Sequence, residues 1–329
     1  MIRKQSERTN NKVFCGLSLL PVAMITLCLA TALLITHLSG LLQNHLGSPQ
    51  KQPLPSSQDS SGQVSSLTNA TVESETKWTH MGADTDVYQR INHFRNTALT
   101  MTTVTDKVGL SSQHTYHNMY GMFLLPYAAN KPNMKMLEIG LGCNMNYGPG
   151  ASVALWKKLF PQAELWLAEY NAPCVQKAKE RNMLDGIHVV TGDQSDPATL
   201  QRWVKESNGG NFDIIIDDGG HKNCQISTSF DYLWPALLPG GYYFIEDLQV
   251  GRWKGWQCGG MIMSDRITEW IDRLLYKYTD AKTKSYKYTM PEDVLFVFCQ
   301  AEACVIGKRQ GPVNDAATDA DKGMAKTST

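Results

Sequence analysis

Short apolar runs alternate with amphipathic stretches between residues 86 and 308, and this alternation constrains the fold more than any other feature. Apolar runs of strand length separated by helical patterns predict βαβ units, and therefore a parallel sheet with helices on both faces. The predicted strands are KMLEIGLG, ELWLAEY, IHVVTGD, FDIIIDD and GGYYFIEDL. The segment DVLFVFCQAEACVIGKR then predicts a hairpin that completes the sheet with an antiparallel edge. The predicted fold class is α/β, with a mainly parallel seven-stranded sheet.

The first predicted strand ends in a glycine-rich turn, LEIGLGCNMNYGPG. Glycines in such a turn let the backbone approach a ligand closely, but they do not identify the ligand. The dinucleotide fingerprint G-x-G-x-x-G would need a third glycine where the chain has Met145. The pattern Glu138-x-Gly140-x-Gly142 instead favours S-adenosylmethionine, although the glycines could serve only to make a tight turn.

Acidic residues at the ends of the next two predicted strands support a cofactor site. Glu169 ends the second strand, where a carboxylate can accept hydrogen bonds from both ribose hydroxyls. Asp193 ends the third strand, near the expected position of an adenine edge. Because ligands of such sheets lie beyond the carboxyl ends of the strands, we predict S-adenosylmethionine contacts at Glu138, Gly140, Gly142, Glu169 and Asp193.

The amino-terminal part of the chain predicts a membrane anchor. Residues 13–42 contain no Asp, Glu, Lys or Arg, and about 20 apolar residues suffice to span a bilayer as a helix. Basic residues precede this run at Arg3, Lys4, Arg8 and Lys12, whereas the next charge is Lys51. The positive-inside bias places residues 1–12 in the cytosol and the domain in the endoplasmic reticulum or Golgi lumen, as a single-pass type II membrane protein. The alternative is a signal peptide cleaved near residues 30–32, which would release a secreted protein.

Polar segments flank the predicted domain. Residues 43–85 are rich in Ser, Gln, Pro and Thr and have few large apolar side chains, so they predict a disordered stem. The polar tail at 309–329 is also predicted to be disordered. The sequon Asn69-Ala70-Thr71 lies in the stem, which fits a lumenal glycoprotein.

Six of the eight cysteines fall within the predicted domain: Cys143, Cys174, Cys224, Cys258, Cys299 and Cys304. In an oxidising lumen they could form disulfides, but the sequence cannot choose the pairing. Cys299 and Cys304 flank the predicted hairpin turn and could bridge it. The chain has 31 basic and 31 acidic residues, and this balance argues against nucleic acid as the main partner.

Several stretches, in this order, carry a family resemblance: TDK at 105–107, LEIGLG, GPGASVALWKKLFP, GDQSDPATL, FDIIIDDGGH and LLPGGYYFIEDL. With them the chain resembles the macrocin and mycinamicin sugar O-methyltransferases, which are metal-dependent class I enzymes related to cephalosporin-hydroxylase-type proteins. The resemblance covers about residues 105–248 and implies a Rossmann-like methyltransferase fold. It also implies that Asp218, Glu246 and Asp247 bind a divalent metal and that His221 is the general base. The chain departs from the family at Glu169, where Asp is usual, at Gly220, where Ser is usual, and in its anchor and stem.

The chemistry of these residue types agrees with the implied roles. Carboxylates at neighbouring strand ends repel one another unless a cation joins them, and oxygen ligands favour Mg²⁺ or Mn²⁺ over Zn²⁺. Such an ion can lower the pKa of a substrate hydroxyl, and His221 could then take its proton. Alternatively, Asp217 and Asp218 could cap the next helix, His221 could be an ordinary first-turn residue, and Glu246 and Asp247 could form a strand-end salt bridge.

Two aromatic segments are open to more than one interpretation. His114, Tyr116, His117 and Tyr120 precede the first predicted strand and could form a lid or a cofactor contact, or pack in the core. Trp253 and Trp256 follow the fifth strand and could stack on a sugar or cover the metal cleft.

The predicted function is S-adenosylmethionine-dependent, metal-assisted O-methylation of a sugar or glycoside hydroxyl in the secretory pathway. The same machinery could methylate a phenolic or other small metabolite. A lumenal glycosyltransferase would share the anchor, stem and acidic residues, but no D-x-D ends a predicted strand. A catalytically silent protein with this fold is a further alternative. The sequence does not indicate the acceptor or the oligomeric state.

Overall fold

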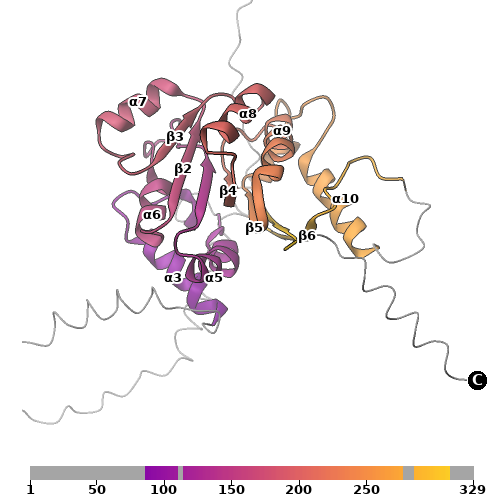
Figure 1. Cartoon of the computed structure of the whole chain (residues 1–329), viewed down its shortest axis with the longest axis horizontal. Coiled ribbons are helices and arrows are strands. Elements are labelled where there is room, and N and C mark those ends of the chain that lie inside the picture. The colour runs from indigo at the N-terminus through magenta and orange to yellow at the C-terminus, as the bar shows by residue number, and fades with distance from the viewer. Residues whose placement is uncertain (1–85, 110–113, 277–284, 312–329) are drawn as a thin grey trace, which may run out of the picture. The chain divides into compact units, whose positions relative to one another are not determined.

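The structure is a computed structural model that describes residues 86–109, 114–276 and 285–311 (Figure 1). The predicted cytosolic tail, membrane anchor and stem, and most of the predicted carboxyl-terminal tail, lie outside these residues. Over the described ranges, no helix is both long enough and apolar enough to cross a bilayer. The anchor at 13–42 therefore stays a prediction.

A single sheet of seven strands in the order β3-β2-β1-β4-β5-β7-β6 forms the centre of the described domain. The strands are β1 Lys135–Ile139, β2 Glu164–Glu169, β3 His188–Thr191, β4 Phe212–Asp217, β5 Leu237–Ile245, β6 Val294–Gln300 and β7 Ala303–Lys308. Strands β1 to β5 pair in parallel, and β7 pairs antiparallel with both β5 and β6. The predicted mainly parallel sheet with an antiparallel hairpin is confirmed. The strand order reverses between β1 and β4, and such a switch point is the usual ligand site of an open α/β sheet.

Helices connect the strands and cover both faces of the sheet (Figure 1). The α-helices are α3 Val87–Leu99, α4 His117–Met119, α5 Leu125–Asn130, α6 Ala151–Leu159, α7 Ala172–Glu180, α8 Pro197–Glu206, α9 Asn223–Leu233 and α10 Met263–Leu275. Shorter helical turns are η1 Asp106–Val108, η2 Tyr120–Leu124, η3 Trp234–Ala236 and η4 Leu248–Arg252.

Side chains along each strand point alternately to the two faces of the sheet, so the hydrophobic core has one part on each face. Ile215 and Tyr243 pack in one cluster with side chains of α8, α9 and α10. Ile214 and Phe244, from the same two strands, pack in the other cluster with side chains of α3, η2 and α6. Because successive strand residues point to opposite faces, the same alternation decides toward which face each acidic side chain near a strand end points.

All six cysteines of the domain form disulfides, which join Cys143 to Cys174, Cys224 to Cys258, and Cys299 to Cys304. The third pair closes the β6–β7 hairpin, as the sequence had allowed. The first joins the turn after β1 to the first turn of α7, and the second joins α9 to the segment after η4. Two of the three disulfides thus constrain loops at the carboxyl edge of the sheet.

Candidate active site

A cavity of about 980 Å³ opens at the carboxyl ends of the parallel strands, around the switch point between β1 and β4. Its volume lies at the upper end of the range for small-molecule sites. Seven of the nine predicted site residues line it: Gly140, Gly142, Glu169, Asp193, Asp218, His221 and Asp247. The lining does not include Glu138 or Glu246.

The glycine-rich turn brings two backbone segments into contact at the carboxyl end of β1. Gly140 has a φ of +107°, and a Cβ atom there would lie 2.1 Å from the carbonyl oxygen of Asp218. Glu169 accepts hydrogen bonds from the backbone N–H groups of Leu141 at 2.9 Å and Asn171 at 2.8 Å. Asp193 accepts from Ser195 through a single oxygen, Oδ1. Both carboxylates line the cavity and retain lone pairs with which they can accept hydrogen bonds from a ligand.

A buried lysine joins three of the acidic residues near the strand ends. The side chain of Lys107 has no exposed surface, and its Nζ lies 2.6 Å from Asp218 Oδ2, 2.7 Å from Glu246 Oε2 and 3.6 Å from Glu138 Oε1. Burial alone would lower the pKa of Lys107, but the carboxylates of Asp218 and Glu246 outweigh it and raise that pKa well above its usual value. Lys107 therefore carries a fixed positive charge beneath the cavity.

Glu246 and Glu138 are held away from the cavity by this lysine and by neighbouring hydroxyl groups. Tyr120 donates a hydrogen bond to Glu246 Oε1, and Ser152 Oγ donates to Glu138 Oε2 at 2.9 Å. Glu246 lies two residues after Phe244 and therefore points to the same face of the sheet, toward η2. Burial raises the pKa of Glu138 to about 7, although Lys107 opposes the shift. The structure therefore does not bring Glu246 together with Asp247, or Glu138 together with the cavity lining.

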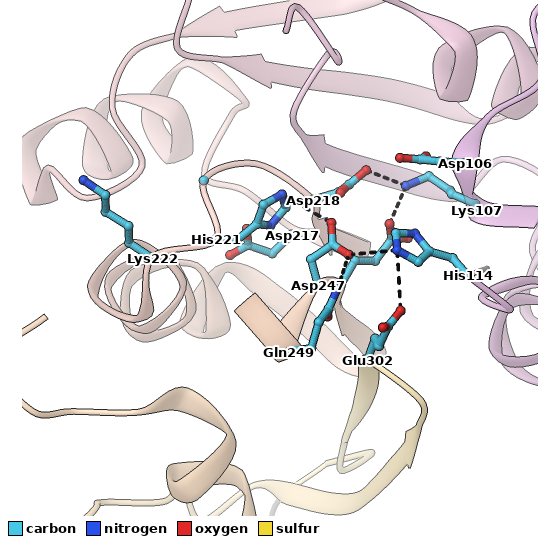
Figure 2. Close-up of polar contacts among 12 residues, drawn as sticks. Asp106, Lys107, His114, Asp217, Asp218, His221, Lys222, Asp247, Gln249 and Glu302 are labelled. Carbon is cyan, nitrogen blue, oxygen red and sulfur yellow. Dashed lines mark hydrogen bonds and ion pairs between the residues drawn. The ribbon is translucent and has the colours of Figure 1, made fainter. Parts of the chain in front are cut away.

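Asp218, His221 and Asp247 form the group of potential metal ligands within the described residues, with one ligand atom of each within 4.8 Å of the others. His221 Nε2 lies 3.4 Å from Asp247 Oδ2, and Lys222 points away from the group (Figure 2). Asp247 adopts a φ of +56°, which reorients its side chain relative to Glu246. Tyr116 donates a 2.7 Å hydrogen bond to Asp247 Oδ1.

The charges around Asp247 keep it ionised. Burial would raise the pKa of Asp247, but the opposing effects of His221 and the hydrogen bond from Tyr116 lower it below its ordinary value. His114 Nε2 also lies 3.6 Å from Asp247 Oδ1 and 3.5 Å from Glu302 Oε2 (Figure 2). Two imidazoles thus flank one carboxylate at the cavity wall.

The helix-capping alternative is wrong. Helix α9 begins at Asn223 with Lys222 as its N-cap, so neither Asp217 nor Asp218 caps it. Asp217 is buried and accepts hydrogen bonds from Gln194 Nε2 at 2.9 Å and from Ser229 Oγ. The salt-bridge alternative holds in part, because Glu246 forms an ion pair with Lys107.

The aromatic residues near the site have separate roles. Tyr116 and Tyr120 are buried and donate to Asp247 and Glu246, so they support the carboxylates and do not form a lid. His114 lines the cavity and stacks on Tyr116 with ring centroids 4.7 Å apart. Trp256 lines the cavity, whereas Trp253 does not and is 56% exposed.

Sequence reasoning missed Lys107 as a site residue. It lies in the TDK stretch that contributes to the family resemblance, yet a single lysine has no periodic signal that predicts burial. Its two close carboxylate partners are 111 and 139 residues away along the chain. The orientation of Glu246 was predictable from the sequence. Glu246 lies two residues after Phe244, so both side chains point to the same face of the sheet, toward α3 and η2.

Sequence comparison confirms the predicted resemblance, although no protein-family model matches the chain. Over 153 residues the chain is 34% identical to a Streptomyces olivaceus 8-demethyl-8-alpha-L-rhamnosyl tetracenomycin-C 2'-O-methyltransferase, covering 46% of this chain and 37% of that protein. Over 124 residues it is 36% identical to mycinamicin VI 2''-O-methyltransferase of Micromonospora griseorubida, covering 37% and 29%. It is 37% identical to demethylmacrocin O-methyltransferase of Streptomyces fradiae over 124 residues, with the same coverage. The chain thus spans about a third of the length of these relatives.

Solved structures of methyltransferases are also similar to the chain. MycE methyltransferase in complex with Mg, SAH and mycinamycin VI aligns with a TM-score of 0.48 at 25% identity, over 70% of this chain and 57% of that one. An O-methyltransferase from Bacillus cereus in complex with SAH aligns with a TM-score of 0.38 at 14% identity, over 72% and 97%.

Proposed function

We propose that this chain, whose matched segment is homologous to sugar O-methyltransferases, is a metal-assisted, S-adenosylmethionine-dependent O-methyltransferase acting on a sugar or glycoside hydroxyl. One observation carries the proposal. The glycine-rich turn, Glu169 and Asp193 share a single cavity with Asp218, His221 and Asp247. A methyl donor and a hydroxyl acceptor could therefore meet in one cavity, which is what methyl transfer requires.

The cofactor side of the cavity fits S-adenosylmethionine. Gly140 lets the turn after β1 pack directly against the carbonyl group of Asp218, and both Gly140 and Gly142 line the cavity. Glu169 has lone pairs for ribose hydroxyls, and Asp193 has an unused carboxylate oxygen near the expected adenine position. When bound, S-adenosylmethionine supplies an electrophilic methyl group.

The carboxylates near the cavity floor fit a divalent cation. Glu138, Asp218 and Glu246 surround the Nζ of Lys107, which supplies one positive charge against these three carboxylates, and ligand atoms of Asp218 and Asp247 lie within 4.8 Å of each other. Mg²⁺ is usually held by one or two carboxylates together with water and substrate oxygens. Asp218 and Asp247 are the carboxylates of this group that line the cavity, so they would hold the ion. A bound ion would lower the pKa of a substrate hydroxyl, and His221, in contact with Asp247, would accept its proton.

Calorimetry on the full chain tests the proposed function. We expect saturable binding of S-adenosylmethionine and no binding of nucleotide sugars or NAD. Methyl transfer to a glycoside should be lost after treatment with EDTA and restored by Mg²⁺ or Mn²⁺, because the hydroxyl is a weak nucleophile without the ion. Preference for a nucleotide sugar would favour the glycosyltransferase alternative. Full activity in EDTA would exclude the metal from the reaction.

We also infer that the domain lies in the lumen of the secretory pathway. All six of its cysteines form disulfides, and disulfides persist in oxidising compartments. The uncharged segment 13–42 and the Asn69 sequon support the same location.

Expression of the full chain in eukaryotic cells tests the location. Glycosidase treatment should reduce the mass of the wild-type chain but not of the Asn69→Gln control, and intact vesicles should protect the domain from protease. Without prior reduction, a thiol reagent should label none of the domain cysteines. A protease-sensitive domain with reactive thiols would contradict the lumenal location.

A further inference from the structure

We propose that Trp256 is the surface on which the acceptor sugar ring stacks, with Gln249 accepting a hydrogen bond from one of its hydroxyls. This inference rests on the proposed function and adds a subsite for the acceptor. The apolar C–H face of a pyranose packs against an indole ring, while the hydroxyls project sideways toward polar groups. A tryptophan beside the proposed base could therefore select a sugar and orient it at the same time.

Trp256 has the position that this role requires. It lines the cavity together with His221 and Gln249, and its ring centroid lies 6.4 Å from that of His221 at an interplanar angle of 30°. The glycine-rich turn, Glu169 and Asp193 form the cofactor part of the lining. An acceptor on Trp256 would lie next to His221 without occupying the cofactor part.

The segment that carries Trp256 is fixed to the element that follows His221. Asn223 is 1% exposed, and its Nδ2 donates to the carbonyl oxygens of Gly251 at 2.7 Å and Trp256 at 3.4 Å. Its Oδ1 accepts from the backbone N–H of Met263 at 2.8 Å, and its own N–H donates to Trp256 at 3.1 Å. The Cys224–Cys258 disulfide adds a covalent link. These bonds fix the backbone of Trp256 relative to the start of α9, which follows His221, and a preorganised subsite requires such a fixed support.

Gln249 supplies a polar group for the same ligand. Its Nε2 donates to Asp247 Oδ1 at 3.1 Å. Its Oε1 is buried and has no hydrogen-bond partner within the described residues, although the side chain lines the cavity. A buried acceptor without a partner is unfavourable, and a sugar hydroxyl would satisfy it.

The test compares two tryptophans of one segment. Trp256→Ala should raise KM for a methyl glycoside about ten-fold and weaken its binding to the S-adenosylhomocysteine-bound full chain, measured by NMR. Trp256→Phe should retain most of the affinity, because a ring remains. Trp253 does not line the cavity, so Trp253→Ala should behave as wild type. In all variants the affinity for S-adenosylhomocysteine should be unchanged.

The outcomes separate the inference from the proposed function. If the wild type binds S-adenosylhomocysteine and methylates a glycoside, but Trp256→Ala leaves KM unchanged or lowers only kcat, Trp256 merely covers the cavity and the inference is wrong. Methylation of catechol but of no methyl glycoside would also overturn it. If the wild type binds no S-adenosylhomocysteine, the proposed function fails and the acceptor subsite fails with it.

Discussion

Replacing His221 with alanine should reduce kcat by about 10²–10⁴-fold, the usual contribution of a general base. His221 Nε2 contacts Asp247, and both line the cavity with Asp218. If His221 acts only on the proton, calorimetry should show that S-adenosylmethionine and Mn²⁺ bind to His221→Ala as to wild type. The loss should therefore appear in kcat and not in binding.

His114→Ala is the matched control for this experiment. His114 also lines the cavity and lies 3.6 Å from Asp247, on the side of Glu302. It does not belong to the Asp218–His221–Asp247 group, so its replacement should reduce kcat much less. A larger loss of kcat for His114→Ala than for His221→Ala would mean that His114, and not His221, is the general base. A loss of Mn²⁺ affinity in His221→Ala would make His221 a metal ligand instead.

Replacing Lys107 with methionine should destabilise the domain by about 3–5 kcal/mol, because removing one partner of a buried ion pair leaves the other charge uncompensated. Methionine keeps the apolar stem but not the ammonium that lies between Asp218 and Glu246. Chemical denaturation would measure the loss. Mn²⁺ affinity should change as well, since Asp218 loses the contact that fixes one of its oxygens.

Lys131→Met tests whether burial causes this effect. Lys131 Nζ lies 2.6 Å from Asp213 Oδ1, the same separation as Lys107 from Asp218, but its side chain is 44% exposed. Its partner Asp213 is buried but still accepts hydrogen bonds from Tyr127 and from the Lys135 N–H, each at 2.8 Å, so this variant should lose clearly less stability than Lys107→Met. Adding Glu246→Gln to Lys107→Met should recover part of the stability. Equal losses for the two lysine variants would contradict the proposed role of the buried charge.

The location of the site was predictable because it depends on a local property of the strands. Each apolar run identifies a strand, and the residues that follow it must lie at the carboxyl edge of a parallel sheet. Glu169 and Asp193 were assigned in this way, the roles of Asp218 and Asp247 were implied by the family resemblance, and all four residues line the cavity. The predicted metal set was only partly assembled, because adjacent residues such as Glu246 and Asp247 need not point the same way.

The sequence by itself determined the α/β class, the hairpin at the sheet edge and the acidic residues at the carboxyl ends of the strands. Hydrophobic periodicity and strand ends depend only on short stretches of neighbouring residues. The tertiary structure decided which groups meet: Lys107 with Glu246, Cys224 with Cys258, and Trp256 rather than Trp253 with the cavity. These choices depend on packing between segments distant in sequence. No local pattern encodes them, because a lysine, cysteine or tryptophan has the same appearance in the sequence whether it is exposed or buried against a partner.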